Sequence, residues 1–401
     1  MLLALTTGFS LSQAFRSLPA IMAPPLAREF ALSAQALGVF AGAFHFSFGA
    51  LQFAMGIGID VFGLRRTVLF FSPLAVVGAT ISAMAPGFGW LVVGQVLTGI
   101  GCAPAFLVCT VFIARSFPPE RFAAVSGLIL GVGSIGLLLT GTPLAWLIEH
   151  SSWRAGFAVL AVCSALAWLS ILMLVREPGG VPARAGRPPL WQALRGYGEL
   201  FRLPHTWSIL ALGLVTYASF LSLRGLWLGP MLIERHGFSL VQSGNVALAV
   251  SLVGMVGPPL FGRLDPGAGR RRWIIGYTLL LAVVFALMAA GPGAALDVAG
   301  AIAVGVLSGY MVLQYADVRA AYPAAMTGRA MAVFTMAIFL GVALMQWLTG
   351  VAASLALSIG MEPYRAVLGA IALILVLGAL AFRVLPQPRT AAAAQAAESG
   401  A

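Results

Sequence analysis

The sequence has no lysine and little charge of any kind. Only 9% of its 401 residues are charged, the 23 basic residues are all arginine, and the acidic residues number 12. Apolar residues make up 60% of the chain, and the mean hydropathy is +0.99. A water-soluble domain needs more polar surface than this composition provides. The composition therefore excludes a soluble globular protein, and the net charge of +11 does not call for a nucleic-acid partner.

Cysteine is also scarce. The three cysteines, Cys102, Cys109 and Cys163, all lie in apolar segments. An odd number of cysteines in such segments provides neither a disulfide framework nor a metal site. The same segments have no paired aspartates and no Ser/His arrangement at depth, so an intramembrane enzyme is the least favoured class. We expect no cofactor and no bound metal.

Long apolar runs dominate the chain. A helix of about 20 apolar residues crosses the hydrocarbon layer of a bilayer. We therefore predict an all-α membrane protein with twelve transmembrane helices. The predicted spans are 3–24, 34–58, 68–88, 90–114, 122–147, 155–175, 206–229, 238–262, 273–291, 296–318, 329–355 and 364–385.

The arginines are distributed unequally between the two sides of these spans. With the N-terminus in the cytoplasm, most of them fall in cytoplasmic loops or the tail, whereas Arg28, Arg154, Arg235 and Arg365 fall outside. This is the positive-inside pattern. We expect a multi-pass protein of the bacterial inner membrane with both termini in the cytoplasm. Residues 3–24 lack a basic n-region, so we interpret them as the first span rather than a cleaved signal peptide.

An internal repeat relates the two halves of the chain. The segment from Gly56 to Arg66 recurs 205 positions later as the segment from Phe261 to Arg272, and the same offset relates Pro118 to Pro323. Parallel repeats of this kind are typical of carriers whose substrate site lies between the halves. We predict an N-terminal six-helix bundle over 1–176, a cytoplasmic linker with an amphipathic helix over 177–205, a C-terminal six-helix bundle over 206–385, and a disordered cytoplasmic tail over 386–401.

The loop after the second span carries a GxxxDxxGxRR pattern. It resembles the signature loop of the major facilitator superfamily, which joins the second and third helices and reappears in degraded form between the eighth and ninth. The glycine-rich fifth span and the segment from Trp153 to Phe157 are similar to further motifs of that family. The resemblance covers nearly the whole chain and implies two pseudo-symmetric six-helix bundles around a central cavity. It also implies a cytoplasmic gate made of Gly56, Asp60, Gly63, Arg65 and Arg66, repeated at Asp265, Arg270 and Arg271.

Two arginines lie inside predicted spans. Arg16 is on the first helix and Arg224 on the seventh, and a central arginine costs roughly 2.5–3.5 kcal/mol on insertion scales. None of the acidic residues lies at mid-depth in a predicted span. If both arginines face the cavity, an anionic substrate could supply the missing counter-charge through bidentate contacts. The alternative is that an arginine snorkels to the headgroups or binds backbone carbonyls as a structural strut.

Arginines on the first and seventh helices resemble those of the organophosphate and organic-anion carriers of the superfamily. Nitrate carriers fit less well, because their arginines are on the second and eighth helices. Other polar residues inside the spans could line the same cavity or simply join helices. These candidates are Gln13, Tyr217, His45, Gln52, Gln314, Tyr310 and Gln346.

His45 is the one histidine within a predicted span, so it is the candidate for proton coupling, with a structural hydrogen bond as the alternative. We predict a secondary transporter that moves a small organic anion, a carboxylate or a phosphate ester, by rocker-switch alternating access. A proton or a counter-anion would be the coupling partner, and we expect a monomer. The alternatives are proton-coupled efflux of hydrophobic drugs or metabolites, and a sensor or assembly factor with the same fold that does not transport.

Overall fold

The computed structural model describes residues 1–118, 131–176, 197–267, 269–291 and 293–388, together with residues 121, 125, 128 and 129. Every regular element within these ranges is a helix. Predicted positions in the linker (177–196) and in the tail (from 389) lie outside the described residues.

The helices of the N-terminal half are mostly pairs of shorter segments that continue one another across a break. In the first span, α1 and α2 break at Leu18 because Pro19 has no backbone N–H to donate. The elements are α1 (Leu2–Ser17), α2 (Pro19–Phe30), α3 (Ala34–Ala50), α4 (Gln52–Phe62), α5 (Leu64–Phe71), α6 (Pro73–Ala83), α7 (Phe88–Cys102), α8 (Ala105–Ser116), α10 (Ile135–Leu139), α11 (Thr142–His150) and α12 (Trp153–Leu174).

The C-terminal half repeats this arrangement. Its seventh span contains a π-helical turn, η1, and its tenth a 3₁₀ turn, η2. The elements are α14 (Pro204–Gly213), α15 (Thr216–Ser222), η1 (Leu223–Trp227), α16 (Leu228–His236), α17 (Leu240–Gly254), α18 (Gly257–Arg263), α19 (Arg270–Ala289), α20 (Ala294–Leu307), η2 (Ser308–Tyr310), α21 (Met311–Ala321), α22 (Ala324–Ser358) and α23 (Pro363–Val384).

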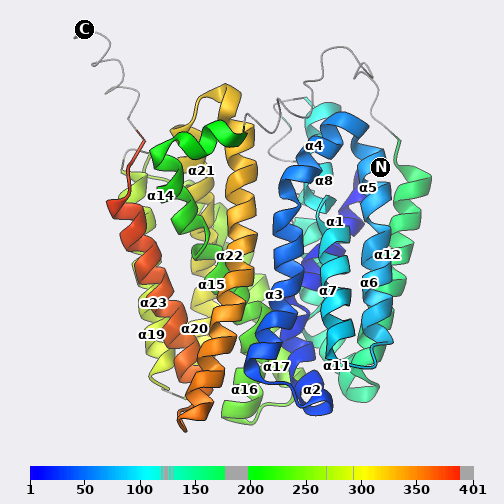
Figure 1. The fold of residues 1–401 in the computed structure, drawn as a ribbon, viewed down its shortest axis with the longest axis vertical. Helices are drawn as coiled ribbons and strands as arrows, with labels where there is room; N and C mark the ends of the chain where they lie inside the picture. The colour runs from blue at the N-terminus through cyan, green and yellow to red at the C-terminus, as the bar shows by residue number, and fades with distance from the viewer. Residues whose placement is uncertain are drawn as a thin grey trace.

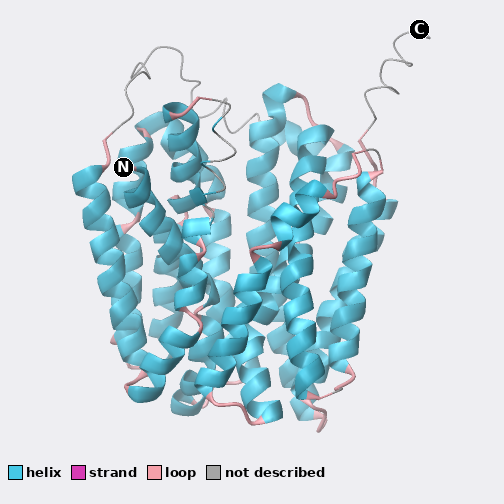
Figure 2. Ribbon diagram, turned by 180° about the vertical axis from the view of Figure 1, so that it is seen from behind, coloured by secondary structure: helices cyan, strands magenta, loops and turns pink. Residues whose placement is uncertain are grey.

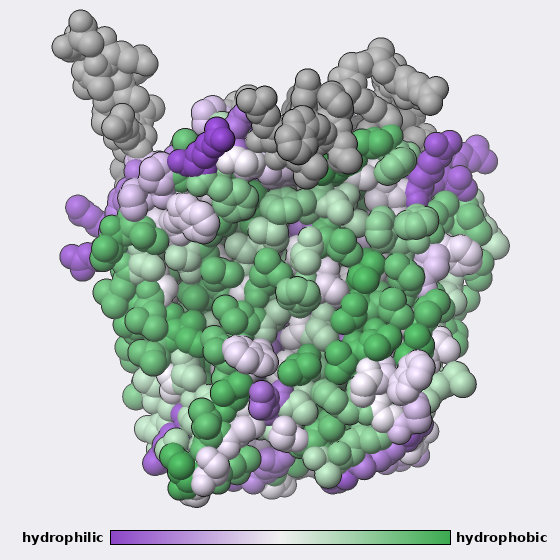
Figure 3. All heavy atoms as spheres, in the orientation of Figure 1, coloured by the Kyte–Doolittle hydropathy of each residue, from purple (hydrophilic) through white to green (hydrophobic). Residues whose placement is uncertain are grey.

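The helices are long and apolar enough to make this a multi-pass membrane protein. Among the described residues, eleven helical stretches can cross a bilayer, and α1 with α2 forms a twelfth. The visible surface is hydrophobic across its middle, and hydrophilic residues gather toward both ends (Figure 3). The helices form two bundles side by side (Figures 1 and 2). The predicted all-α fold of two six-helix bundles is confirmed.

Several predicted span limits are wrong. The first span continues to Phe30 and the seventh to His236, because helical hydrogen bonding continues past the apolar layer. Each ends at a left-handed residue, Ala31 (φ 49°) and Gly237 (φ 70°), which terminates the helix. The third span ends at Ala83 rather than residue 88, because Pro86 and Gly87 form the following turn.

The sequence repeat is visible as a repeated contact. In the N-terminal bundle, Glu29 accepts a hydrogen bond from Trp153 Nε1 at 2.5 Å and pairs with Arg154 at 2.7 Å. In the C-terminal bundle, Glu234, 205 positions after Glu29, accepts from the Tyr364 hydroxyl at 2.5 Å. Each carboxylate therefore ties the end of a bundle's first helix to the start of its last helix.

Two of the helix pairs that join the bundles are called seams, and α2 also packs on η1 and α16 across the same interface. In the first seam α3 packs on α22; a Cβ at Gly38 would lie 2.5 Å from Gln346 O, so only glycine permits this approach. In the second seam α11 packs on α17, where Thr142 Oγ1 donates to Asn245 Oδ1 at 2.5 Å. We call these the α3/α22 seam and the α11/α17 seam.

Candidate functional site

Arg16 extends from α1 into the α3/α22 seam. Its guanidinium carbon lies 4.5 Å from the ring centre of Phe48 and 4.6 Å from that of Phe339. Phe48 belongs to α3 and Phe339 to α22, so each bundle contributes one ring to the contact. Its Nη1 donates to Gln13 Oε1 at 2.6 Å and its Nη2 to Ser12 Oγ at 3.3 Å. Arg16 is 6% exposed, and its charge is therefore almost fully removed from solvent.

The Arg16 guanidinium keeps unused donors. Two of the five N–H groups of an arginine are engaged here, and Nε has no hydrogen-bond partner among the described residues. No described carboxylate forms a salt bridge with it. The site therefore holds a buried positive charge with free donor capacity.

Arg224 has different surroundings. It lies in the π-helical turn η1 and is 0% exposed. Its Nε lies 3.0 Å from both Ala247 O and Ser251 Oγ, and its Nη2 donates to Leu137 O at 3.2 Å. Leu137 belongs to the N-terminal bundle, so this arginine links the two bundles through one main-chain oxygen, the geometry of a strut, while its Nη1 has no partner among the described residues.

The two arginines thus point into different seams. Arg16 contacts the α3/α22 pair, whereas Arg224 contacts α17 and the α10 segment that precedes α11. The predicted role of Arg224 in substrate binding stays a prediction, and its contacts are those of the structural alternative.

Three other candidates gather around Arg16. The His45 ring is stacked 6.4 Å from Phe339, and its Nδ1 lies 3.1 Å from Ala41 O. The Tyr217 ring lies 6.4 Å from Phe339 as well. Gln346, on α22, donates weakly to Leu221 O at 3.4 Å. Within the described chain, His45 Nε2 and Gln346 Oε1 have no hydrogen-bond partner, so Nε2 could donate to or accept from a ligand, and Oε1 could accept from one.

The remaining polar candidates form their hydrogen bonds elsewhere, and Gln314 Nε2 has no partner among the described residues. The Gln52 amide donates to Phe48 O in its own span at 3.2 Å. Tyr310 shares a hydrogen bond of 2.9 Å with Thr278, and Gln314 accepts one of 3.0 Å from Thr216. Both of these bonds lie inside the C-terminal bundle.

Sequence reasoning missed Ser12, Phe48 and Phe339. Ser12 lies four residues before Arg16, and this helical spacing could have identified it. The two phenylalanines carry no such signal, because aromatic residues are abundant in every span. Only the packing of α3 on α22 brings the two rings together.

The repeated loops differ in how their arginines are held. Arg65 Nε donates to Val175 O at 2.7 Å and its Nη2 to Leu172 O at 3.0 Å, and Arg66 is exposed.

The other predicted gate residues of the first loop are two glycines and Asp60. Gly63 adopts φ 90°, which permits the turn between α4 and α5. The backbone of Gly56 lies within helix α4. The Asp60 side chain lies outside the described set, so its part in the gate stays a prediction.

The second loop holds two ion pairs. Arg270 binds Asp265 with both Nε and Nη2 at 2.8 Å, and these hydrogen bonds lower the pKa of the Asp265 carboxyl. Arg271 binds Asp317 on α21, with Nη2 at 3.0 Å from one carboxylate oxygen, and its guanidinium carbon lies 4.5 Å from the Phe382 ring. The second pair joins the start of α19 to the end of α21.

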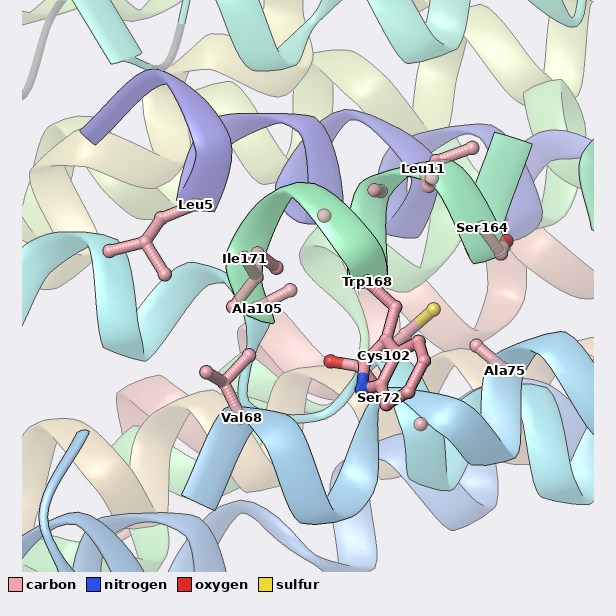
Figure 4. A pocket seen from close by; sticks show the side chains of 13 residues that line it. Leu5, Leu11, Val68, Ser72, Ala75, Cys102, Ala105, Ser164, Trp168 and Ile171 are labelled. Atoms are coloured by element: carbon pink, nitrogen blue, oxygen red, sulfur yellow. The ribbon is translucent and has the colours of Figure 1, made fainter. Parts of the chain in front are cut away.

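A small pocket lies inside the N-terminal bundle between α1, α5, α6, α7, α8 and α12 (Figure 4). Its lining is mostly apolar or small, with the sulfur of Cys102 and the hydroxyls of Ser72 and Ser164 among its polar groups. It contains no charged residue and lies within one bundle. The lining of this pocket therefore has no positive charge that could bind an anion as Arg16 could.

The comparisons with known proteins agree with the fold. A family model described as Major Facilitator Superfamily matches residues 5–346. The chain belongs to this family of membrane transporters.

Its similar relatives include several named transporters. An MFS-type efflux pump of Mycolicibacterium smegmatis is 26% identical over 287 residues (67% of this chain, 63% of the relative). A "Probable sulfoacetate transporter" of Cupriavidus necator is 24% identical over 287 residues (68% and 66%). The hexuronate transporter of Bacillus subtilis is 21% identical over 253 residues (60% and 58%). The chain spans less than two-thirds of each of these relatives.

Solved structures show the same fold. A bacterial homologue of the human lysosomal transporter Spinster has a TM-score of 0.75 at 19% identity, with 96% of this chain and 95% of that chain covered. A D-xylose-proton symporter has a TM-score of 0.75 at 17% identity, with 97% and 98% covered.

Proposed function

We propose that the chain is a secondary active transporter that moves a small organic anion across the inner membrane by alternating access. The bundles over 1–176 and 206–385 would move relative to each other, joined by the linker. The observation that supports an anion is Arg16, a buried guanidinium with an unpartnered Nε and no carboxylate partner in the described chain.

A buried charge without a counter-ion is unfavourable. Two cation–π contacts of about 0.5–2 kcal/mol each and two hydrogen bonds offset part of the cost of burying Arg16. An anionic ligand would supply the opposite charge and occupy the free donors. Substrate binding would therefore gain energy from a charge that the empty protein stabilises only in part.

The place of Arg16 also suits alternating access. Its guanidinium contacts one ring of the N-terminal bundle and one ring of the C-terminal bundle. A ligand bound there would contact both bundles, as expected for a site at the interface between repeats. The names of two relatives, the sulfoacetate and hexuronate transporters, denote organic anions and support the same substrate class.

The ion pairs of the second loop support a gate at the face where α1 begins and α23 ends (Figure 1). With that face in the cytoplasm, Asp265, Arg270 and Arg271 would form the latch in the C-terminal half and Gly56, Asp60, Gly63, Arg65 and Arg66 its counterpart. His45 would be the group that carries a proton if the anion moves with one, because arginine does not release its proton.

Uptake into proteoliposomes tests the proposal. The full chain is reconstituted, and uptake of labelled carboxylates, sulfonates and phosphate esters is measured. We expect Arg16→Gln to abolish uptake of the anion that the native protein carries. Arg28→Gln is the matched control, because Arg28 is an exposed residue at the end of the same span. Normal uptake by Arg16→Gln, at equal reconstitution, would contradict the proposal.

Efflux of hydrophobic compounds is the second candidate. The aromatic rings of Phe44, Phe48 and Phe339 near Arg16 favour it, as does the similarity to the Mycolicibacterium smegmatis efflux pump. Cationic drugs in the same assay separate the two, because a positive ligand would be repelled by Arg16. Transport of a cationic drug that is unchanged or improved in Arg16→Gln would favour efflux.

A further inference from the structure

We infer, on the basis of the proposed function, that the transported anion is a monocarboxylate with an apolar body. The number of available charges, the open edge of Arg16 and the nature of its neighbours each support part of this inference.

The first argument is charge. Arg16 and Arg224 are the arginines that lie in the middle of the described spans, and Arg224 is bound to Ala247 O, Ser251 and Leu137 O in the other seam. Although Arg224 Nη1 has no partner among the described residues, it belongs to that other seam, so the α3/α22 seam offers the ligand one guanidinium. A dianion, such as a phosphate ester or a dicarboxylate, would place a second negative charge in the seam without a partner, and that charge is costly to bury.

The second argument is geometry. The ring centres of Phe48 and Phe339 lie 4.5 and 4.6 Å from the guanidinium carbon and 4.5 Å from each other, so both rings lie on the same side of it. The N–H groups of a guanidinium point outward in its plane, so a ligand that accepts from the unpartnered Nε approaches an edge. A planar carboxylate fits this approach, because its two oxygens can accept parallel hydrogen bonds from one guanidinium edge.

The third argument concerns the rest of the ligand. The rings near Arg16 form a continuous aromatic cluster. Measured between ring centres, Phe44 lies 5.9 Å from Phe48, and Phe48 lies 4.5 Å from Phe339. The centre of the Tyr217 ring lies 6.4 Å from that of Phe339. Beside them, His45 Nε2 and Gln346 Oε1 are described polar atoms without a partner. A polyhydroxylated body would bury more hydroxyl groups than these atoms can satisfy, whereas an apolar body packs against the rings.

A matched set of small molecules tests the inference on the purified full chain in nanodiscs, by calorimetry or by the ligand-induced rise in melting temperature. Benzoate and cyclohexanecarboxylate are apolar monoanions. Phthalate adds a second carboxylate to benzoate, benzamide removes its charge, and glucuronate replaces the apolar body with hydroxyl groups. A phosphate ester and a sulfonate complete the set.

We expect at least one apolar monocarboxylate to bind, with phthalate, benzamide and glucuronate weaker by about tenfold or more. Arg16→Gln should remove this binding. Arg16→Lys should weaken it despite the retained charge, because an ammonium cannot form the planar pair. Phe339→Leu should weaken binding of benzoate more than that of glucuronate.

The contrary outcomes separate the inference from the proposed function. If phthalate, glucuronate or the phosphate ester binds more tightly than both monocarboxylates and loses its affinity in Arg16→Gln, the inference is wrong and the proposed function stands. If neither monocarboxylate binds, the inference is also wrong. The proposed function fails as well only when no anion of the set shows binding that depends on Arg16.

Discussion

The two seams between the bundles each hold one buried arginine, and these arginines have different partners. In the α3/α22 seam, Arg16 is held by two rings and two side-chain oxygens. In the α11/α17 seam, Arg224 is held by two main-chain oxygens and one hydroxyl. Side chains can change rotamer when a ligand arrives, whereas helix carbonyls move only with their helices. The comparison indicates that one seam is suited to binding and the other to joining the bundles.

The largest effect should come from loss of the Arg16 charge. We expect Arg16→Gln to weaken anion binding by about 100-fold or more, since removing one partner of a buried charge pair costs roughly 2–5 kcal/mol. Arg224→Gln should keep most of the affinity of the folded protein. Calorimetric titration of both variants measures this difference. A larger loss of affinity in Arg224→Gln would reverse the roles of the two seams.

The next effect concerns stability. Arg224→Gln should lower the free energy of unfolding by about 2–3 kcal/mol, because its contact to Leu137 O across the bundles and its contact to Ala247 O within its own bundle are lost in a fully buried place. Arg16→Gln should lower it less, because its partners Gln13 and Ser12 lie on its own helix. Melting temperatures in the same detergent compare the two variants. Equal destabilisation by the two variants would contradict the assignment of Arg224, rather than Arg16, as the arginine that joins the bundles.

A third comparison is between the two repeated loops. Asp317 pairs with Arg271 in the C-terminal half, and the position 205 residues earlier is the buried Phe112. Asp317→Asn leaves Arg271 without its charge partner and should cost about 1–3 kcal/mol. Adding Arg271→Gln should recover part of that loss, and thermal unfolding of the single and double variants measures it. If the losses of the two single variants simply add, the ion pair does not couple α19 to α21.

The sequence predicted much of the fold for a physical reason. The apolar runs and the arginine distribution follow from the bilayer, and the repeated loop follows from the duplication of the chain. These three patterns predicted the helices and their order. Helix ends were less well predicted, because Arg28 and Glu29 continue a helix that hydropathy alone would end. Within the site, Arg16 and its neighbour Gln13 were identified because polar residues are rare in these spans.

The partners of those residues could not be predicted. Whether Arg224 faces a ligand or a carbonyl depends on the π-helical turn that sets its direction, and no motif marks that turn. The pairing of Phe48 with Phe339 depends on how closely the glycines of α3 let α22 approach. These are properties of packing between segments that lie about 290 residues apart in sequence.

The smallest effect is expected at the edge of the second loop, where Asp265 pairs with Arg270. Its pKa is lowered in the folded protein, so the pair adds stability above the pKa of the unfolded chain and loses it as the pH falls through the lower folded value. Because both side chains are partly exposed, we expect less than about 1 kcal/mol. Asp265→Asn should therefore remove a small, acid-sensitive part of the stability at neutral pH, and melting temperatures between pH 3 and pH 7, about the range of a carboxyl titration, measure it. A difference between the native chain and Asp265→Asn that persists at the lowest pH would assign the effect to the shape of the loop rather than to the charge. The hydrogen bonds of this pair join Asp265 to Gly267 and to the first residue of α19, whereas Arg271 and Asp317 join two helices, so its loss should leave anion affinity unchanged.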